Sequence, residues 1–163
     1  MVFVEENMRI MVAIEGSLFS QLAIRAVAQR IRPEGAKVLL VHAIEPAAFF
    51  EQDESVQERL RRPQELLDAA ADELTENGFR DVDVRVINAD PRAGLLEIAA
   101  KWQPDLIVMG SHGRKGLEKL MLGSVAESVA HHASCSVLIV RIAASWAKEP
   151  QSELTTEPST APG

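Results

Sequence analysis

The chain has 163 residues, of which 47% are hydrophobic and 25% charged, a size that suits one domain with a substantial buried core. Its net charge of −7 argues against a nucleic acid partner, because binding to a phosphate backbone needs clustered Lys and Arg. No apolar run is long enough to cross a bilayer, and Glu5 and Glu6 stand where a leader would carry basic residues, so we expect a cytoplasmic protein without membrane insertion.

Short apolar runs alternate with longer segments of helical period along most of the chain. We expect strands at residues 8–14, 37–43, 82–88, 105–109 and 136–141. The first and fourth runs are nearly continuous in apolar side chains, which is typical of strands in the middle of a sheet. This alternation predicts an α/β fold in which helices cover both faces of a parallel sheet. No segment repeats, so we expect a single module.

Helix signals lie between the predicted strands. Residues 17–31 have an apolar stripe of helical period, formed by Leu22, Ala23, Ala26, Val27 and Ile31. Further along, Asp90 and Pro91 are typical of an N-cap and a first helical residue, and Pro104 ends that helix. The region 51–77 is acidic and helical in period, but it contains Pro63. This proline should either start the main helix at about residue 63 or break a longer one.

The composition changes after Ile142 to Ala, Ser, Thr, Pro, Glu and Gln. Such a segment buries too little apolar surface to offset its ordering entropy. We therefore expect a domain over residues 1–142 and a disordered tail over residues 143–163.

The chain has one cysteine, Cys135, which cannot form an internal disulfide and which we interpret as a small packing residue. His131 and His132 are adjacent, so on a helix their side chains point about 100° apart and cannot share a metal as an i, i+4 pair can. We predict no metal site and no catalytic residue.

The most informative segment runs from Asp105 to Ser124, where an apolar strand leads into a glycine-broken loop whose far end opens a helix. Gly110, Gly113 and Gly123 are spaced along this loop. Glycine lets the backbone come close to a ligand, and the unpaired N–H groups of a helix N-terminus favour an anion. The segment therefore predicts a phosphate cradle, and a nucleotide as the ligand.

This segment, continued through Arg141, resembles the signature of the universal stress protein family, specifically its ATP-binding branch. Residues 8–17 and 38–45 resemble the first and second strands of that family, so that the resemblance covers roughly residues 8–142. It implies a flavodoxin-like or Rossmann-like three-layer sandwich with strand order 3-2-1-4-5. It also implies a homodimer in which strand 136–141 pairs with its copy, and bound ATP, with or without Mg²⁺.

The resemblance also implies which residues hold ATP. Around the base and ribose it places Ala13, Ile14, Glu15 and Ala43, with Met109 and Gly110 beneath them. Around the phosphates it places Gly113, Gly123, Ser124, Val125 and Ala126. From the residues themselves we expect Ser124 to cap its helix and donate a hydroxyl, and Arg114 or Lys115 to supply a mobile positive charge. His112 could contact a phosphate or be solvated, and the sequence leaves both open.

Three positions depart from the family pattern. Glu15 stands where nucleotide-binding members usually have Asp, and Ala43 is smaller than the common Val. The small side chain of Ala43 leaves room for the longer side chain of Glu15, a compensation that we treat as a hypothesis. Ala89 stands where a glycine is often found.

The predicted function is that of a regulatory module that binds ATP and changes its contacts with an unidentified protein partner during starvation, oxidative or osmotic stress. We do not expect an enzyme beyond slow ATP hydrolysis, because no Walker-type Gly-Lys-Ser/Thr run is present. The alternative is a dimeric scaffold of the same family that binds no nucleotide, which Glu15 favours. An ATP pyrophosphatase is disfavoured, because such chains carry a Ser-Gly-Gly type of loop where this one has Glu15-Gly16-Ser17.

Overall fold

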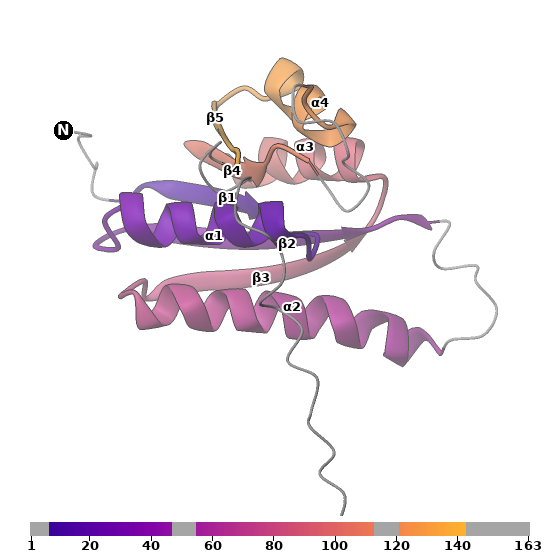
Figure 1. Ribbon diagram of the computed structural model, residues 1–163, viewed down its shortest axis with the longest axis horizontal. Coiled ribbons are helices and arrows are strands. Elements are labelled where there is room, and N and C mark those ends of the chain that lie inside the picture. Colours follow the sequence, from indigo (N-terminus) through magenta and orange to yellow (C-terminus); the bar gives the residue numbers. More distant parts are fainter. Residues whose placement is uncertain (1–6, 47–54, 113–120, 143–163) are drawn as a thin grey trace, which may run out of the picture.

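The computed structural model describes residues 7–46, 55–112 and 121–142. Within these ranges strands and helices alternate along the chain (Figure 1). The elements are β1 (Arg9–Ala13), α1 (Leu18–Arg30), β2 (Lys37–Ile44), α2 (Val56–Glu76), β3 (Asp81–Asn88), α3 (Pro91–Trp102), β4 (Leu106–Gly110), α4 (Ser124–His132) and β5 (Ser136–Val140). All five predicted strands are present, and none of their ends is displaced by more than one residue. The predicted tail, residues 143–163, lies outside the described residues.

The strands form one parallel sheet in the order β3-β2-β1-β4-β5, as predicted. β1 lies at its centre, where Ile10 is in register with Val38 of β2 on one side and with Leu106 of β4 on the other. The chain winds outward in one direction through β2 and β3 and in the other through β4 and β5. Ligands of such sheets bind at the carboxyl ends of the strands where this reversal occurs, here beyond β1 and β4.

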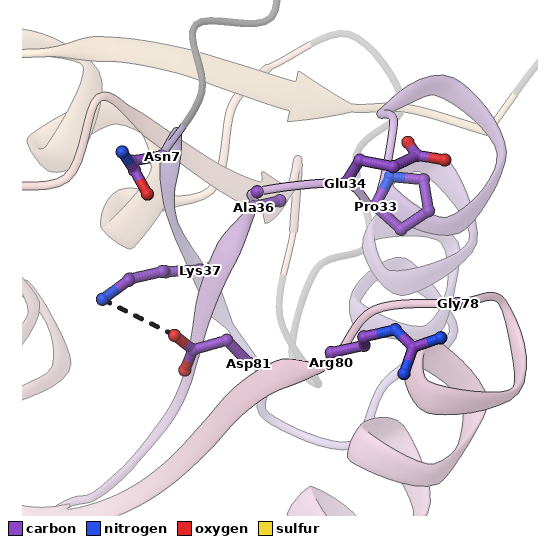
Figure 2. Close-up of a pocket in the computed structure, with 9 residues that line it drawn as sticks. Asn7, Pro33, Glu34, Ala36, Lys37, Gly78, Arg80 and Asp81 are labelled. Carbon is purple, nitrogen blue, oxygen red and sulfur yellow. Dashed lines mark ion pairs between the residues drawn. The ribbon is translucent and has the colours of Figure 1, made fainter.

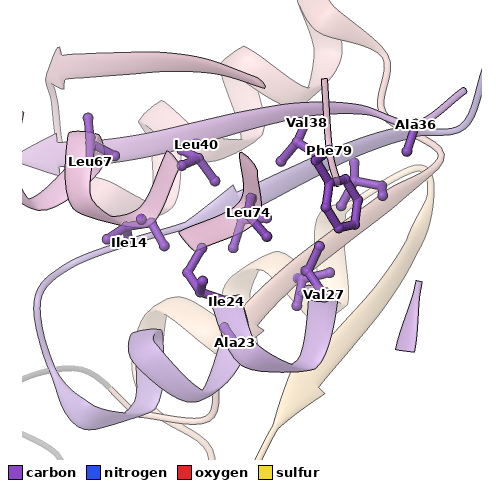
Figure 3. Packing of buried hydrophobic residues seen from close by; sticks show 14 residues of the cluster. Ile14, Ala23, Ile24, Val27, Ala36, Val38, Leu40, Leu67, Leu74 and Phe79 are labelled. Atoms are coloured by element: carbon purple, nitrogen blue, oxygen red, sulfur yellow. The ribbon is translucent and has the colours of Figure 1, made fainter. Parts of the chain in front are cut away.

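Two hydrophobic clusters lie on opposite faces of the sheet, because successive side chains of a strand point to opposite faces. Ile10 and Val12 of β1 pack with α1, α2 and Phe79 in the first cluster, which Figure 3 shows. Met11 of β1 packs with Leu95 of α3 and with α4 in the second. The sheet is therefore covered on both faces, which explains its nearly continuous apolar strands.

The start of α3 follows its sequence signal closely. Asp90 caps α3, its carboxylate accepting hydrogen bonds from the backbone N–H groups of Arg92 at 3.0 Å and Ala93 at 3.2 Å, and Pro91 is the first helical residue. The predicted stripe of α1 is confirmed in part. Ala23, Ala26 and Val27 are buried, whereas Leu22 and Ile31 are partly exposed, and Ser20 and Ile24 take places in the stripe that we did not predict.

The prediction for Pro63 was wrong, because α2 neither starts at this residue nor breaks there. The helix runs from Val56 to Glu76, with Pro63 buried inside it. The proline ring removes one backbone hydrogen bond, but its burial recovers apolar surface. Arg61 also forms ion pairs with Glu58 at 2.6 Å and Glu65 at 2.8 Å, which link the turns before and after the proline. Burial and side-chain pairing therefore outweigh the local helix-breaking tendency.

The departure from glycine at Ala89 is accommodated by a glycine elsewhere. A Cβ added to Gly94 of α3 would lie 2.9 Å from the Cβ of Ala89 and 2.7 Å from Cδ1 of Ile87. The absence of a side chain at Gly94 thus makes room for the methyl group of Ala89.

No helix within the described ranges has the length and apolar character needed to cross a membrane.

Candidate functional site

A cavity of about 520 Å³ lies at the carboxyl ends of β1, β2 and β4, next to the start of α4. We call it the carboxyl-end cavity. Ten of the twelve predicted ligand residues line it, namely Ala13, Ile14, Glu15, Ala43, Met109, Gly110, Gly123, Ser124, Val125 and Ala126. The other two, Gly113 and Arg114, lie outside the described residues, as does Lys115. Segments more than a hundred residues apart in the sequence therefore meet at the predicted place.

The phosphate end of this cavity is the N-terminus of α4. The N-cap is Gly123 and makes no side-chain hydrogen bond, so the prediction that Ser124 caps the helix was wrong. Ser124 is instead the first helical residue, because the chain takes helical dihedral angles one residue earlier than we expected. Within the described part of the chain the backbone N–H groups of Ser124, Val125 and Ala126 have no hydrogen-bond acceptor. Three donors are therefore available to an anion.

The chain segment before α4 is tied to the sheet. The Gly123 N–H donates to the Ser111 carbonyl at 2.8 Å, and the Ser111 N–H donates to the Val140 carbonyl of β5 at 2.9 Å. Ser111 itself is buried. These bonds hold the start of α4 against the end of β4, so that the open N–H groups have a fixed position at the cavity.

Gly110 has a packing role that the glycine pattern did not reveal. A Cβ at this position would lie 2.5 Å from the Cβ of Phe19 and 2.8 Å from its backbone carbonyl carbon. Gly110 is therefore needed for the close approach of α1 to the end of β4. We had attributed this glycine to the approach of a ligand, and the structure gives it a structural reason as well.

His112 lies at the wall of the cavity and is partly buried there. Its Nδ1 is 3.0 Å from the Oγ of Ser111, and its ring centroid is 5.3 Å from that of Phe19. The structure thus places this ring at the cavity wall, and contact with a phosphate stays a prediction. Met109, which the resemblance places beneath the base and ribose, is 5% exposed and belongs to the second cluster.

Several lining residues were not predicted, among them Ser20, His42, Glu45 and Leu95. Glu45 directly follows β2, so its position at a strand end could have suggested it. Ser20 follows Ser17 by three residues, within the segment that we predicted as a helix. His42 and Leu95 look like ordinary members of apolar runs, and only the fold brings them to this wall.

Charge is unevenly distributed around the cavity. Glu15 and Glu45 follow β1 and β2, and the described lining residues include no Lys or Arg. The positive end is supplied by the backbone of α4, through its N–H groups and helix dipole. At the start of α3, the hydrogen bond from Arg92 and those from the backbone lower the pKa of the Asp90 carboxyl. The cavity thus presents backbone N–H donors at α4 and carboxylate acceptors near β1 and β2.

Within the described ranges no three His, Cys, Asp or Glu side chains are grouped so that they could hold a metal ion. Cys135 is partly buried and packs against the second cluster. Burial, and then the charge of Asp105, raise the pKa of its thiol. These features agree with its interpretation as a packing residue, because a reactive cysteine needs a lowered pKa.

A second hollow, of about 440 Å³, lies at the opposite end of the sheet, and we call it the amino-end cavity. Figure 2 shows it between the loops that precede β2 and β3. Its charged side chains are exposed, and Lys37 and Asp81 form an ion pair at 3.6 Å. Among its described lining residues there is no counterpart of the helix N-terminus that opens onto the carboxyl-end cavity.

The fold and the cavity define a class of doubly wound α/β proteins with a candidate anion site at the switch point of the sheet. A model of the universal stress protein family matches residues 6–141, and the chain belongs to this family. It is 32% identical over 138 residues to a universal stress protein of Thermus aquaticus, covering 81% of this chain and 97% of that protein. It is 37% identical over 100 residues to one from Synechocystis, covering 60% of this chain and 64% of that protein.

Solved structures agree with this assignment. The hypothetical protein MJ0577 superimposes with a TM-score of 0.71 at 25% identity, covering 85% of this chain and 99% of that one. A universal stress protein in complex with cAMP superimposes with a TM-score of 0.68 at 25% identity, covering 85% and 100%. An Arabidopsis thaliana family member with AMP bound, at 19% identity and a TM-score of 0.62, supports the fold.

Proposed function

We propose that this protein is an ATP-binding regulatory module and that ATP, with or without Mg²⁺, binds in the carboxyl-end cavity. One observation carries the proposal: the N-terminus of α4 has no side-chain cap and opens onto the cavity that ten predicted ligand residues line. A universal stress protein with the same fold has been solved in complex with cAMP, which supports an adenine nucleotide as the ligand.

The phosphates would bind at the start of α4. The N–H groups of Ser124, Val125 and Ala126 are donors whose positions the fold fixes, and the helix dipole favours negative charge there. Each hydrogen bond from an amide to a charged oxygen contributes about 1.5–3 kcal/mol. Two or three such bonds therefore account for a substantial part of a micromolar affinity, which corresponds to about 8 kcal/mol.

The nucleoside would extend from α4 toward the ends of β1 and β2. Val41, Ala43, Leu95 and Met109 give this end of the cavity an apolar lining that suits a planar base. Glu15 adds a carboxylate that can accept a hydrogen bond from the ribose hydroxyls or from the amine of the base. Ala43 is partly exposed at the same wall, and we infer that its small side chain leaves space for the longer Glu15.

The role is regulatory rather than enzymatic. Phosphoryl transfer needs a metal-binding carboxylate near the γ-phosphate, and the two described carboxylates of the lining follow β1 and β2 rather than β4. ATP would alter the contacts of the protein with a partner protein in the cytoplasm. The second subunit would join at β5, an edge strand with the partly buried side chains of Val137–Val140.

The test starts with the protein as purified. It should be denatured, and the supernatant analysed by mass spectrometry for adenine nucleotides; the emptied and refolded protein should then be titrated with ATP, ADP and AMP by calorimetry. We expect a released adenine nucleotide and saturable binding of ATP. Absence of both would leave the alternative, a dimeric scaffold. Sedimentation equilibrium tests the dimer separately, and a monomer at all concentrations would remove it from the proposal.

A further inference from the structure

The side chain of Glu15 is held in place by the loop that follows it. Its Oε1 accepts a hydrogen bond from the backbone N–H of Ser17 at 3.1 Å and another from the Oγ of Ser17. The same Oγ is the N-cap of α1 and accepts from the N–H of Ser20. A single hydroxyl therefore joins a carboxylate of the cavity wall to the start of a helix.

The Ser17 hydroxyl acts both as a hydrogen-bond acceptor and as a donor. Its oxygen accepts from the helix, which leaves its one proton free to be donated, and the donation goes to Glu15. Ser20 completes the network, because its Oγ accepts from the Gly16 N–H at 3.2 Å and donates to the Ser17 carbonyl at 3.0 Å. Ser20 is 2% exposed and also lines the cavity. The loop is thus fixed by its own hydrogen bonds.

The hydrogen bonds from Ser17 offset a disadvantage of having Glu rather than Asp at position 15. Glutamate has one more rotatable bond than aspartate, so fixing its carboxylate costs more side-chain entropy. A carboxylate that is already held loses less of this freedom when a ligand arrives, which improves binding. Ser17 supplies that restraint from the protein side, before any nucleotide binds.

We propose that Ser17 is a positioning residue, which fixes Glu15 so that its carboxylate accepts a hydrogen bond from the nucleoside of a bound nucleotide. The donor is a ribose hydroxyl or the exocyclic amine of the base. Ser17 thereby sets the selectivity of the cavity for nucleotides that carry this donor. The inference rests on the proposed function, because it needs a nucleotide in the carboxyl-end cavity.

Variants of Ser17 separate positioning from helix capping. Ser17→Asp keeps a good N-cap but places a carboxylate beside Glu15, which repels it. Ser17→Gly keeps most of the capping preference and removes the hydroxyl, and Ser17→Thr retains the hydroxyl. Ser55→Ala is the matched control, because Ser55 caps α2 through a bond from the Glu58 N–H at 3.3 Å and does not line the cavity.

The measurement is the calorimetric Kd for ATP, 2′-deoxy-ATP, 3′-deoxy-ATP and purine riboside triphosphate, which lacks the amine. We expect the original protein to bind ATP about tenfold more tightly than the analogue that lacks the donor to Glu15. The ratio of the Kd of that analogue to the Kd of ATP should fall toward one in Ser17→Asp and Ser17→Gly. In Ser17→Thr this ratio should be kept. Ser55→Ala should lower thermal stability without changing the ratio. Glu15→Ala should bring the ratio to one, and the double variant Glu15→Ala/Ser17→Gly should have the same ratio.

The outcomes distinguish the two proposals. If the original protein binds no nucleotide, both the proposed function and the role of Ser17 are overturned. If it binds ATP and all three analogues with the same Kd, the role of Ser17 is overturned and the proposed function stands. The same conclusion follows if folded Ser17→Asp and Ser17→Gly proteins keep the original Kd ratio. The two capping-competent variants ensure that a folding failure of one still leaves a decisive measurement.

Discussion

The two ends of the sheet carry hollows of similar size, about 520 Å³ at the carboxyl end and about 440 Å³ at the amino end, but they differ in chemistry. In a parallel sheet with helical crossovers, the helices start at the carboxyl end and finish at the amino end. Unpaired N–H groups therefore collect at one end and unpaired carbonyls at the other. Within the described residues the N-terminus of α4 has no side-chain cap, and this favours an anion there.

At the amino end of the sheet, several of the described polar groups are satisfied by one another. The guanidinium of Arg9 donates to the carbonyl of Trp102 at the end of α3, at 3.0 Å from Nε and 2.6 Å from Nη2, and lies 4.2 Å from the centroid of the Trp102 ring. Lys37 pairs with Asp81. The comparison teaches that the size of a hollow says little about its function, and that open hydrogen-bonding capacity says more.

The largest effect should come from Gly123→Val, which places a branched side chain at the open helix start. The φ of −64° at Gly123 is accessible to valine, so the fold should be retained with a loss of about 1 kcal/mol at the cap. Loss of one or more amide contacts should weaken ATP binding at least tenfold. Calorimetry on the folded variant measures this.

The control for this variant is Lys37→Val at the amino-end cavity, which should leave the Kd for ATP unchanged. A folded Gly123→Val protein with the original affinity would remove the open helix start from the proposed site, and with it the difference between the two ends.

Next in size is Gly110→Ala, which tests packing at the carboxyl end. The added Cβ meets the backbone of Phe19 and cannot be relieved by a side-chain rotation, so α1 must shift. We expect the free energy of unfolding to fall by about 1–3 kcal/mol. Urea denaturation measures it, with Ala126→Gly in α4 as a comparison at another small residue of the cavity wall. Unchanged stability in Gly110→Ala would contradict the packing role.

Much of this carboxyl-end site could be predicted from sequence, because each contributing segment has a local signature. Strand ends were predicted within one residue because apolar runs stop abruptly, as at Gly110. Pro63 was misjudged because its burial is a tertiary property. The capping role of Ser17 is a local pattern, but its bond to Glu15 depends on how the loop turns. The packing of Gly110 on Phe19 joins two elements that are distant in sequence.

A smaller effect is expected for the ion pair of the amino end. Lys37 and Asp81 are about half exposed, so solvent and salt screen their attraction. A double-mutant cycle with Lys37→Ala and Asp81→Ala should give a coupling of about 0.2–1 kcal/mol that decreases at high salt. A coupling well above this range, or a change in ATP affinity in either variant, would show that the amino-end cavity has a role that we do not assign to it.

The smallest effect concerns Cys135, which lies just before β5 at the amino end. Its raised pKa means that less thiolate is present at pH 8 than for an ordinary cysteine. Alkylation by iodoacetamide should therefore be several-fold slower in the folded protein than in the urea-unfolded protein. The difference should shrink as the pH rises and both thiols ionise. Equal rates at pH 8 would contradict the packing interpretation.

The most direct test of the account is to map which backbone amide NMR signals shift when a triphosphate binds. Amide NMR spectra should be recorded while the protein is titrated with ATP and, in parallel, with adenosine. We predict that ATP produces the largest shifts at the N–H groups of Ser124, Val125 and Ala126, and that adenosine leaves these three nearly unchanged while shifting residues near Ala13 and Ala43. If ATP leaves the start of α4 unperturbed, or shifts residues around Lys37 and Arg80 instead, the open helix N-terminus is not the phosphate site.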